Sequence, residues 1–186
     1  MADVIGAIRD KWLALGGDRF TGPALDSERP TFDGVGRAQS FANGVVISWH
    51  PQLGAFVVLG AIGQKWHSLG REQFGYPVTD ELGTPDGRGR FNHFRAMQLA
   101  GGPVASIYWT PQTGPHEVHG AIRAAWEGTG FERGPLGYPT SDETGSGSHR
   151  RSNFEHGFID WTPQRGAQVH GPVKFDDGAE LQPADG

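Results

Sequence analysis

The densest group of chemically capable side chains in the sequence is His116-Glu117-x-His119. It lacks the helical His-Glu-x-x-His spacing that places two histidines on one Zn²⁺ ion in zinc proteases. In a strand, Glu117 and His119 share one face and His116 points to the other, so the three side chains do not converge. We therefore predict no metal site and no cofactor.

Other catalytic signatures are also missing from the sequence. It contains no Gly-x-Ser-x-Gly elbow, no phosphate-binding loop and no calcium-binding loop. These absences favour a protein that is not an enzyme. A hydrolase is the weaker alternative, because dispersed catalytic residues leave no local motif.

Side chains in turns offer binding chemistry instead. An Asp follows a Pro by three residues at three places, and its carboxylate suits either capping of backbone amides or a ligand. A Gln follows a Pro in three further turns, and its amide suits either paired sugar hydroxyls or contacts between segments. Tyr76 and Tyr138 each precede a Pro, where the ring either forms a rigid aromatic platform for a sugar or is buried against the hairpin. Tyr108 fits either sugar stacking or an ordinary surface position. The candidate ligand-binding residues are Tyr76, Tyr138, Tyr108, Gln52, Gln112, Gln164, Asp80 and Asp142.

These candidates belong to a pattern that the sequence repeats three times. Each copy has an Ile two positions before a Trp, followed by x-Pro-Gln-x-Gly, which predicts a β-hairpin with a Pro-Gly turn. The Ile and the Trp share one strand face, for which a core position is favoured over sugar stacking, and we expect the opposite face to be exposed. The pairs are Ile47 and Trp49, Ile107 and Trp109, and Ile159 and Trp161.

A short amphipathic helix precedes each hairpin. Apolar residues recur at helical spacing between residues 5 and 15, and the same element returns after Gly60 and after Gly120. The sequence therefore predicts one domain over residues 1–173, built from tandem repeats, followed by an acidic, disordered tail at 174–186. The three predicted repeats span about residues 5–59, 60–119 and 120–171.

The second repeat is longer than the others between its lone Phe94 and its hairpin Trp109. This predicts a loop inserted near residues 95–104. Insertions of this kind fall on the surface, where they either shape a binding rim or are tolerated without function.

Composition limits the classes of partner. A formal net charge of -5 provides no basic field for a phosphate backbone, so we expect no nucleic acid binding. No apolar run reaches membrane-spanning length and no signal peptide is evident, so we expect a soluble, cytoplasmic chain as written, without membrane insertion. With no cysteine, disulfides and thiolate chemistry are excluded.

The predicted fold is an α+β repeat protein. Three helix-plus-hairpin repeats are expected to pack around a pseudo-threefold axis as a propeller-like closed ring. We favour a ring over a linear solenoid because three units without an obvious capping repeat would leave both ends open to water.

The motifs Phe74-Gly75-Tyr76-Pro77 and Leu136-Gly137-Tyr138-Pro139, each preceded by a Gly-Ala-Ile-x-x-x-Trp helix, resemble the LGFP repeat. The resemblance covers the whole repeated region, although the first copy departs from it at Thr21-Gly22-Pro23-Ala24. LGFP modules are associated with cell-surface proteins of mycolic-acid bacteria, where they are thought to bind wall polysaccharide or to anchor the protein.

The resemblance implies a non-catalytic, lectin-like module in the cell wall or outside the cell. Its expected partners are glycans or cell-wall polysaccharide, bound at up to three shallow sites between repeats, with the second and third repeats contributing more than the first. A protein-interaction or scaffold module, presenting the insertion near residues 95–104 to a protein partner, is the alternative.

Overall fold

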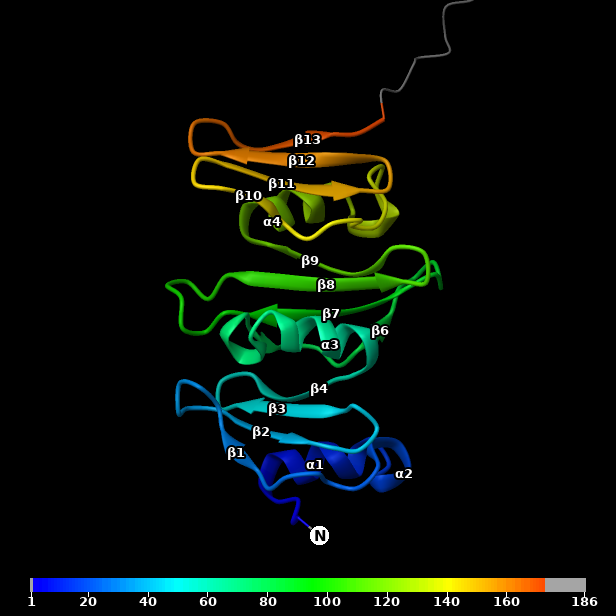
Figure 1. The fold of residues 1–186 in the computed structure, drawn as a ribbon, viewed down its shortest axis with the longest axis vertical. Coiled ribbons are helices and arrows are strands. Elements are labelled where there is room, and N and C mark those ends of the chain that lie inside the picture. The colour runs from blue at the N-terminus through cyan, green and yellow to red at the C-terminus, as the bar shows by residue number, and fades with distance from the viewer. Residues whose placement is uncertain (1, 173–186) are drawn as a thin grey trace, which may run out of the picture.

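The protein is a straight stack of three antiparallel β-sheets, as Figure 1 shows for the computed structural model, which describes residues 2–172. Each sheet belongs to one repeat, and the strand orders are β1-β2-β3-β4, then β5-β7-β8-β9 with β6 paired to β7, then β10-β11-β12-β13. The predicted tail at 174–186 lies outside the described residues. None of the helices within residues 2–172 is long and apolar enough to cross a membrane.

The elements follow one another in the same order in each repeat. The first repeat contains α1 (Gly6–Ala14), α2 (Asp18–Thr21), β1 (Arg29–Pro30), β2 (Arg37–Ser40), β3 (Val46–His50) and β4 (Gly54–Val58). The second contains α3 (Gly60–Ser68), the 3-10 helix η1 (Arg71–Gln73), β5 (Tyr76–Pro77), β6 (Leu82–Gly83), β7 (Arg90–Arg95), β8 (Val104–Thr110) and β9 (Gly114–His119). The third contains α4 (Gly120–Gly128), the 3-10 helix η2 (Phe131–Arg133), β10 (Thr144–Ser146), β11 (His149–Phe154), β12 (Gly157–Thr162) and β13 (Gly166–His170).

One nine-residue helix packs against the central hairpin of each sheet, α1 on β3 and β4, α3 on β8 and β9, and α4 on β12 and β13. The helices open at Gly6, Gly60 and Gly120, whose φ angles of 55°, 58° and 56° lie in the left-handed region that suits glycine. In α3 and α4 the inward Trp66 and Trp126 are fully buried, and their indole N–H groups donate to the carbonyls of Gly75 and Gly137. The predicted helices are therefore present.

One tyrosine fastens the second repeat to the first, and an equivalent tyrosine fastens the third repeat to the second. The Tyr76 hydroxyl donates to the Asp33 carboxylate at 2.7 Å, and the Tyr138 hydroxyl donates to Asp86 at 2.6 Å. Each ring passes over a glycine, Gly36 or Gly89, where an added Cβ would lie 2.6 Å and 2.8 Å from the tyrosine ring. Only glycine leaves room for the ring at this point.

A lysine and an aspartate form a second fastening at each junction. Lys11 of α1 pairs with Asp80 at 2.9 Å, and Lys65 of α3 pairs with Asp142 at 2.6 Å. Asp80 also accepts the backbone N–H of Val57 on the edge strand β4, and Asp142 accepts that of Glu117 on β9. The side chains of the next repeat thus satisfy polar groups that an uncovered edge strand would leave unpaired.

The prediction of a pseudo-threefold, propeller-like closed ring is wrong, because the chain is mostly β and its three sheets stack in a line without closing. The end repeats explain why a line is stable. The first repeat has Gly22 where the others have Tyr76 and Tyr138, and the third has Ala125 where the others have Lys11 and Lys65. Each end repeat therefore lacks fastening residues on its outward side, which is the capping that the sequence reasoning overlooked.

Consecutive repeats run in opposite directions. In Figure 1 the arrows of β3 and β12 point one way and that of β8 points the other. Equivalent features of the first and third repeats consequently lie on one side of the stack, and those of the second repeat lie on the opposite side.

Candidate binding site

The three tyrosines predicted to bind ligand lie inside the protein. Tyr76, Tyr138 and Tyr108 are 1%, 0% and 2% exposed, respectively, so their rings offer no face to a ligand. Burial raises the pKa of all three hydroxyls above their usual range, which keeps them protonated as hydrogen-bond donors. The expectation that Tyr108 is exposed is wrong, because its strand face is covered by Phe91, Trp126 and Phe131.

The predicted aspartates lie at the repeat junctions. Burial by itself would raise the pKa of Asp142, but hydrogen bonds from His116 and Lys65 hold it well below its usual range. Asp80 and Asp142 each form an ion pair with a lysine and accept a hydrogen bond from a backbone N–H. Each carboxylate accepts a backbone N–H from an edge strand of the preceding repeat, and not from the Pro turn where capping was expected.

The three predicted glutamines, Gln52, Gln112 and Gln164, are exposed in the hairpin turns. They are separate from one another and line none of the pockets described below. The structure therefore does not bring the eight predicted site residues together into one site.

A different set of residues forms one pocket in each repeat. We name each pocket by its tryptophan, and their volumes are about 420 Å³ (Trp49 pocket), 190 Å³ (Trp109 pocket) and 260 Å³ (Trp161 pocket). All three have the same construction, with a half-buried Trp from the central strand, a Glu–Arg pair and the first turn of the helix. The shared residues are Glu28, Arg37 and Trp49, then Glu81, Arg90 and Trp109, then Glu143, Arg150 and Trp161.

The arginine and the tryptophan are neighbours across two strands. Arg37 pairs in register with Trp49, Arg90 with Trp109, and Arg150 with Trp161. Residues that are directly opposite in an antiparallel pair project from the same face. The sheet therefore places a flat aromatic side chain beside a cationic one in every repeat.

A glutamate holds each arginine in place. The nitrogen–oxygen distance is 3.7 Å between Arg37 and Glu28, and 2.8 Å both between Arg90 and Glu81 and between Arg150 and Glu143. The glutamates are mostly buried, whereas the arginines are more exposed. Each pair thus presents an anchored guanidinium and carboxylate at the pocket edge.

The helix start completes the wall. Ile8, Ile62 and Ile122 form a buried apolar base, and the adjacent first-turn residues line the opening. None of these three helices has a side chain capping its N-terminus or an acidic residue in its first turn. Their first-turn N–H groups consequently have no partner within the helix.

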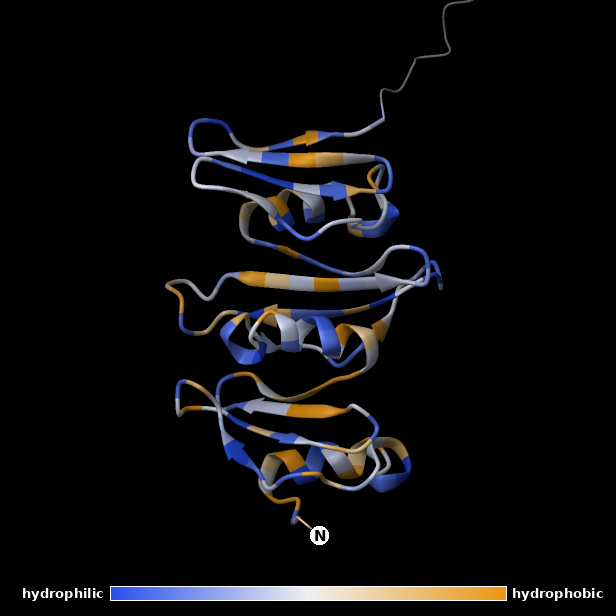
Figure 2. Cartoon of the chain, viewed as in Figure 1, coloured by the Kyte–Doolittle hydropathy of each residue, from blue (hydrophilic) through white to orange (hydrophobic). Residues whose placement is uncertain are grey.

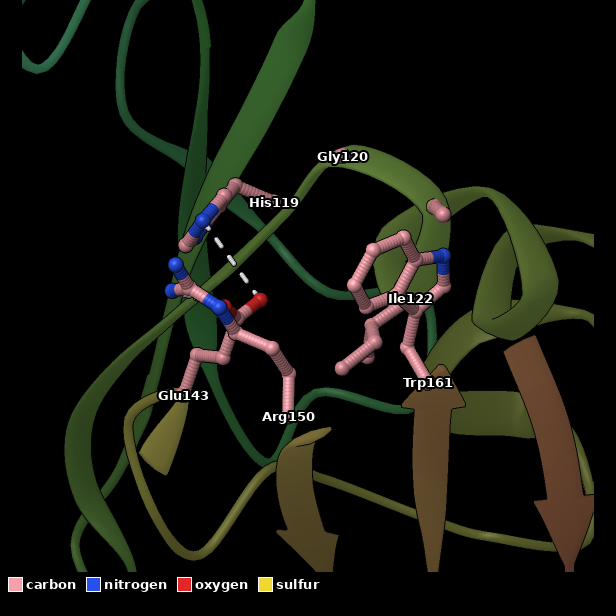
Figure 3. A pocket seen from close by; sticks show the side chains of 7 residues that line it. His119, Gly120, Ile122, Glu143, Arg150 and Trp161 are labelled. Atoms are coloured by element: carbon pink, nitrogen blue, oxygen red, sulfur yellow. Dashed lines mark hydrogen bonds and ion pairs between the residues drawn. The ribbon is translucent and has the colours of Figure 1, made fainter. Parts of the chain in front are cut away.

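The Trp161 pocket differs by one residue. His119 stands where the earlier repeats have Ile5 and Leu59 before the helix, and Figure 3 shows it facing Glu143 across from Trp161. Its Nδ1 lies 2.6 Å from the buried Glu117, and this hydrogen bond raises the pKa of His119 despite the opposing effect of burial. The third pocket thus carries a titratable cation that the other two lack.

The sequence contained signals for these pockets. An Arg occurs four residues before the lone Phe of each repeat, as Arg37 precedes Phe41, and a Glu follows each repeated Asp by one or two residues. The hairpin tryptophans were expected to be core because they share a strand face with buried isoleucines. They do pack against the core clusters, but the helix covers the isoleucine more fully than the tryptophan, which lies nearer the strand end and stays partly exposed at the start of the helix.

The pocket chemistry suits a neutral polyhydroxylated ligand. A half-exposed indole offers an apolar face, and the Glu–Arg pair supplies an acceptor and several donors in a fixed arrangement. Within residues 2–172, no three His, Cys, Asp or Glu side chains are grouped so as to hold a metal ion.

Comparisons with known proteins agree with the internal repeats. The family model described as LGFP repeat matches residues 22–73, 74–134 and 136–174, which together make up most of the chain. A comparison with curated proteins found no match.

Proposed function

The chain belongs to the LGFP repeat family, and from this premise we propose that it is a non-catalytic carbohydrate-binding module whose tryptophan pockets hold saccharides. Cell-wall polysaccharide is the ligand that the family resemblance implies. The observation that carries the proposal is that one pocket, made from Trp, Glu, Arg and a helix start, occurs in each repeat.

The proposed binding mode follows from the orientation of the groups. A sugar ring stacks its apolar face on the indole, while its hydroxyls hydrogen-bond to the carboxylate, the guanidinium and the free N–H groups of the helix start. Because the Glu–Arg pair is already formed in the absence of ligand, little side-chain entropy is lost on binding. The pockets are small and open, so individual sites are weak and longer saccharides gain affinity by engaging two of them.

The proposal is tested by calorimetry with wall-derived oligosaccharides at millimolar concentration. Trp109→Ala and Trp161→Ala each remove a stacking surface and are expected to cost their own site about 1 kcal/mol, which corresponds to roughly fivefold weaker binding. Gln112→Ala and Gln164→Ala are matched controls, because these exposed side chains lie in the same hairpins but line no pocket. If the glutamine variants lost affinity and the tryptophan variants did not, the binding site would lie in the turns. The proposal that the pockets bind saccharides would then be wrong.

A further inference from the structure

A fourth cavity, of about 300 Å³, lies where the second repeat carries its extra residues, and we call it the insertion pocket. It lies under the connection between β7 and β8, which spans residues 96–103. The corresponding connection is a short turn in the first and third repeats. The lining residues are Gln73, Phe74, Ala96, Leu99, Pro103, Val104, Ala105, His119 and Gly120.

The connection that builds this pocket has a defined shape. Backbone hydrogen bonds join Ala96 to Pro103, Leu99 to Ala96, and Gly102 to Leu99. The Gln98 side chain donates to the Gln73 carbonyl and so fastens the connection to the end of η1. A loop that is held in this way presents a preformed cavity to solvent.

The insertion pocket is more apolar than the tryptophan pockets, and no Glu–Arg pair lines it. Leu99 at its rim is 54% exposed, and Ala96, Pro103 and Val104 continue the lining. Figure 2 shows hydrophobic colouring in this connection, where it projects from the stack between β7 and β8. The exposed Leu99 side chain beside this mostly apolar cavity gives an apolar group of a ligand a place to bind.

The insertion pocket adjoins the Trp161 pocket. Both are lined by His119 and Gly120, so they meet at the start of α4. In Figure 1 the β7–β8 connection and the start of α4 lie on the same side of the stack. The Trp161 pocket and the insertion pocket are therefore neighbours that share two lining residues, and we treat them together as one composite site.

We infer that this composite site binds a saccharide carrying an alkyl or acyl chain, with the sugar in the Trp161 pocket and the chain in the insertion pocket. The inference rests on the proposed function, since it assumes that the Trp161 pocket takes a sugar. The shared residues require the apolar group to be attached close to the sugar, which selects an amphiphilic saccharide over two separate ligands.

The test uses matched methyl and octyl β-glycosides of glucose, galactose and arabinose, below micelle-forming concentrations, with affinity measured by NMR titration. For at least one sugar, the octyl glycoside is expected to bind at least about tenfold more tightly than the methyl glycoside, because a few buried methylenes supply that difference. Nuclear Overhauser contacts are expected between the octyl chain and the methyl groups of Leu99 and Val104.

Two variants separate the sugar from the chain. Leu99→Asp is expected to abolish the tighter binding of the octyl glycoside while leaving the affinity for the methyl glycoside unchanged. Leu25→Asp is the control, at a leucine in the first repeat that is 67% exposed, and it is expected to change neither affinity. Trp161→Ala is expected to weaken both glycosides.

Each contrary outcome has its own meaning. Equal binding of the methyl and octyl glycosides overturns the composite site and leaves the proposed function standing. Octyl binding that survives Leu99→Asp overturns it as well. A third outcome is that no methyl glycoside binds and that Trp161→Ala leaves octyl glycoside binding unchanged. Both the composite site and the proposed function then fail. The insertion pocket would in that case bind a purely apolar ligand or a protein side chain.

Discussion

At the scale of single residues, the junction tyrosines have a structural role that can be measured. Tyr76→Phe keeps the buried ring but removes the hydroxyl that donates to Asp33, and Tyr138→Phe removes the one that donates to Asp86. Each change is expected to lower the free energy of unfolding by about 1–3 kcal/mol, since the hydrogen bond is partly buried and its acceptor is charged. Urea denaturation measures the loss.

The same variants distinguish structure from ligand binding. Saccharide affinity is expected to stay at the wild-type value in both, because neither hydroxyl reaches a pocket. If a variant kept its stability but lost saccharide affinity, the predicted role of these tyrosines in ligand binding would be correct after all.

The carboxylate partner of Tyr76 makes the junction sensitive to acid. Burial alone would raise the pKa of Asp33, but hydrogen bonds from Tyr76, Thr31 and two backbone N–H groups lower it to about 2. A depressed pKa contributes stability that is complete above the unfolded value near 4 and is lost as the pH falls toward 2. Melting temperatures measured across this range should therefore fall more steeply in the wild type than in Asp33→Asn. Parallel curves for the two proteins would show that this carboxylate does not couple the junction to pH.

At the scale of elements, the strand β9 carries a charged pair, Glu117 and His119. The first junction has Val57 on β4 and Leu59 just after it at the corresponding positions. Glu117 is buried and pairs with His119, whose pKa is raised. His119→Leu is expected to destabilise the protein by about 2 kcal/mol, because it leaves a buried carboxylate without its strongest partner. Adding Glu117→Val, which recreates the residues of the first junction, is expected to recover part of the loss.

The pH dependence gives this pair a second readout. A raised histidine pKa contributes stability that is fully present below the unfolded value near 6.5 and is lost as the pH rises through the folded value. Thermal melts from pH 6 to 9 should show this loss in the wild type and not in His119→Leu. A pH-independent difference between them would mean that folding does not shift the pKa of His119.

Much of the element pattern could be predicted from the sequence, and the reason is local. The helices are set by apolar spacing and by glycines such as Gly60, the hairpins by the Pro-Gly turns, and the insertion near 95–104 by a length difference. The depth of the tryptophans could not be predicted in this way. Period two places Trp109 on the same face as Ile107, but how far the helix extends over that face depends on packing.

At the scale of the whole molecule, the closed ring was predicted because the end repeats were treated as equal to the middle one. Gly22 and Ala125 are ordinary residues when each repeat is considered alone. Their meaning emerges only when Tyr76 and Lys65, at the corresponding positions, are found to contact another repeat. The same long-range contacts account for the tyrosines and aspartates of the predicted site, since fastening residues recur in repeats for structural reasons alone.

Because the repeats alternate in direction, we predict that the three tryptophan pockets contribute unequally to the binding of a long saccharide. The strands β3 and β12 run in one direction and β8 runs in the other (Figure 1), which places the strand ends that carry Trp49 and Trp161 on one side of the stack and the end that carries Trp109 on the other. A long linear saccharide can engage the Trp49 and Trp161 pockets together, so its affinity gain over a short saccharide should largely disappear in Trp49→Ala or in Trp161→Ala. Trp109→Ala should leave most of the gain intact. An equal loss in all three variants, measured by calorimetry with short and long oligosaccharides, would contradict this arrangement.

The most direct test of the pockets follows the six indole N–H signals in an NMR titration with a wall-derived oligosaccharide. The indoles of Trp12, Trp66 and Trp126 donate hydrogen bonds inside the protein and serve as internal controls. If saccharides bind in the tryptophan pockets, the signals of Trp49, Trp109 and Trp161 are expected to shift with saccharide concentration while the three control signals stay in place. Saturating shifts elsewhere on the protein, with the three pocket indoles unmoved, would contradict it.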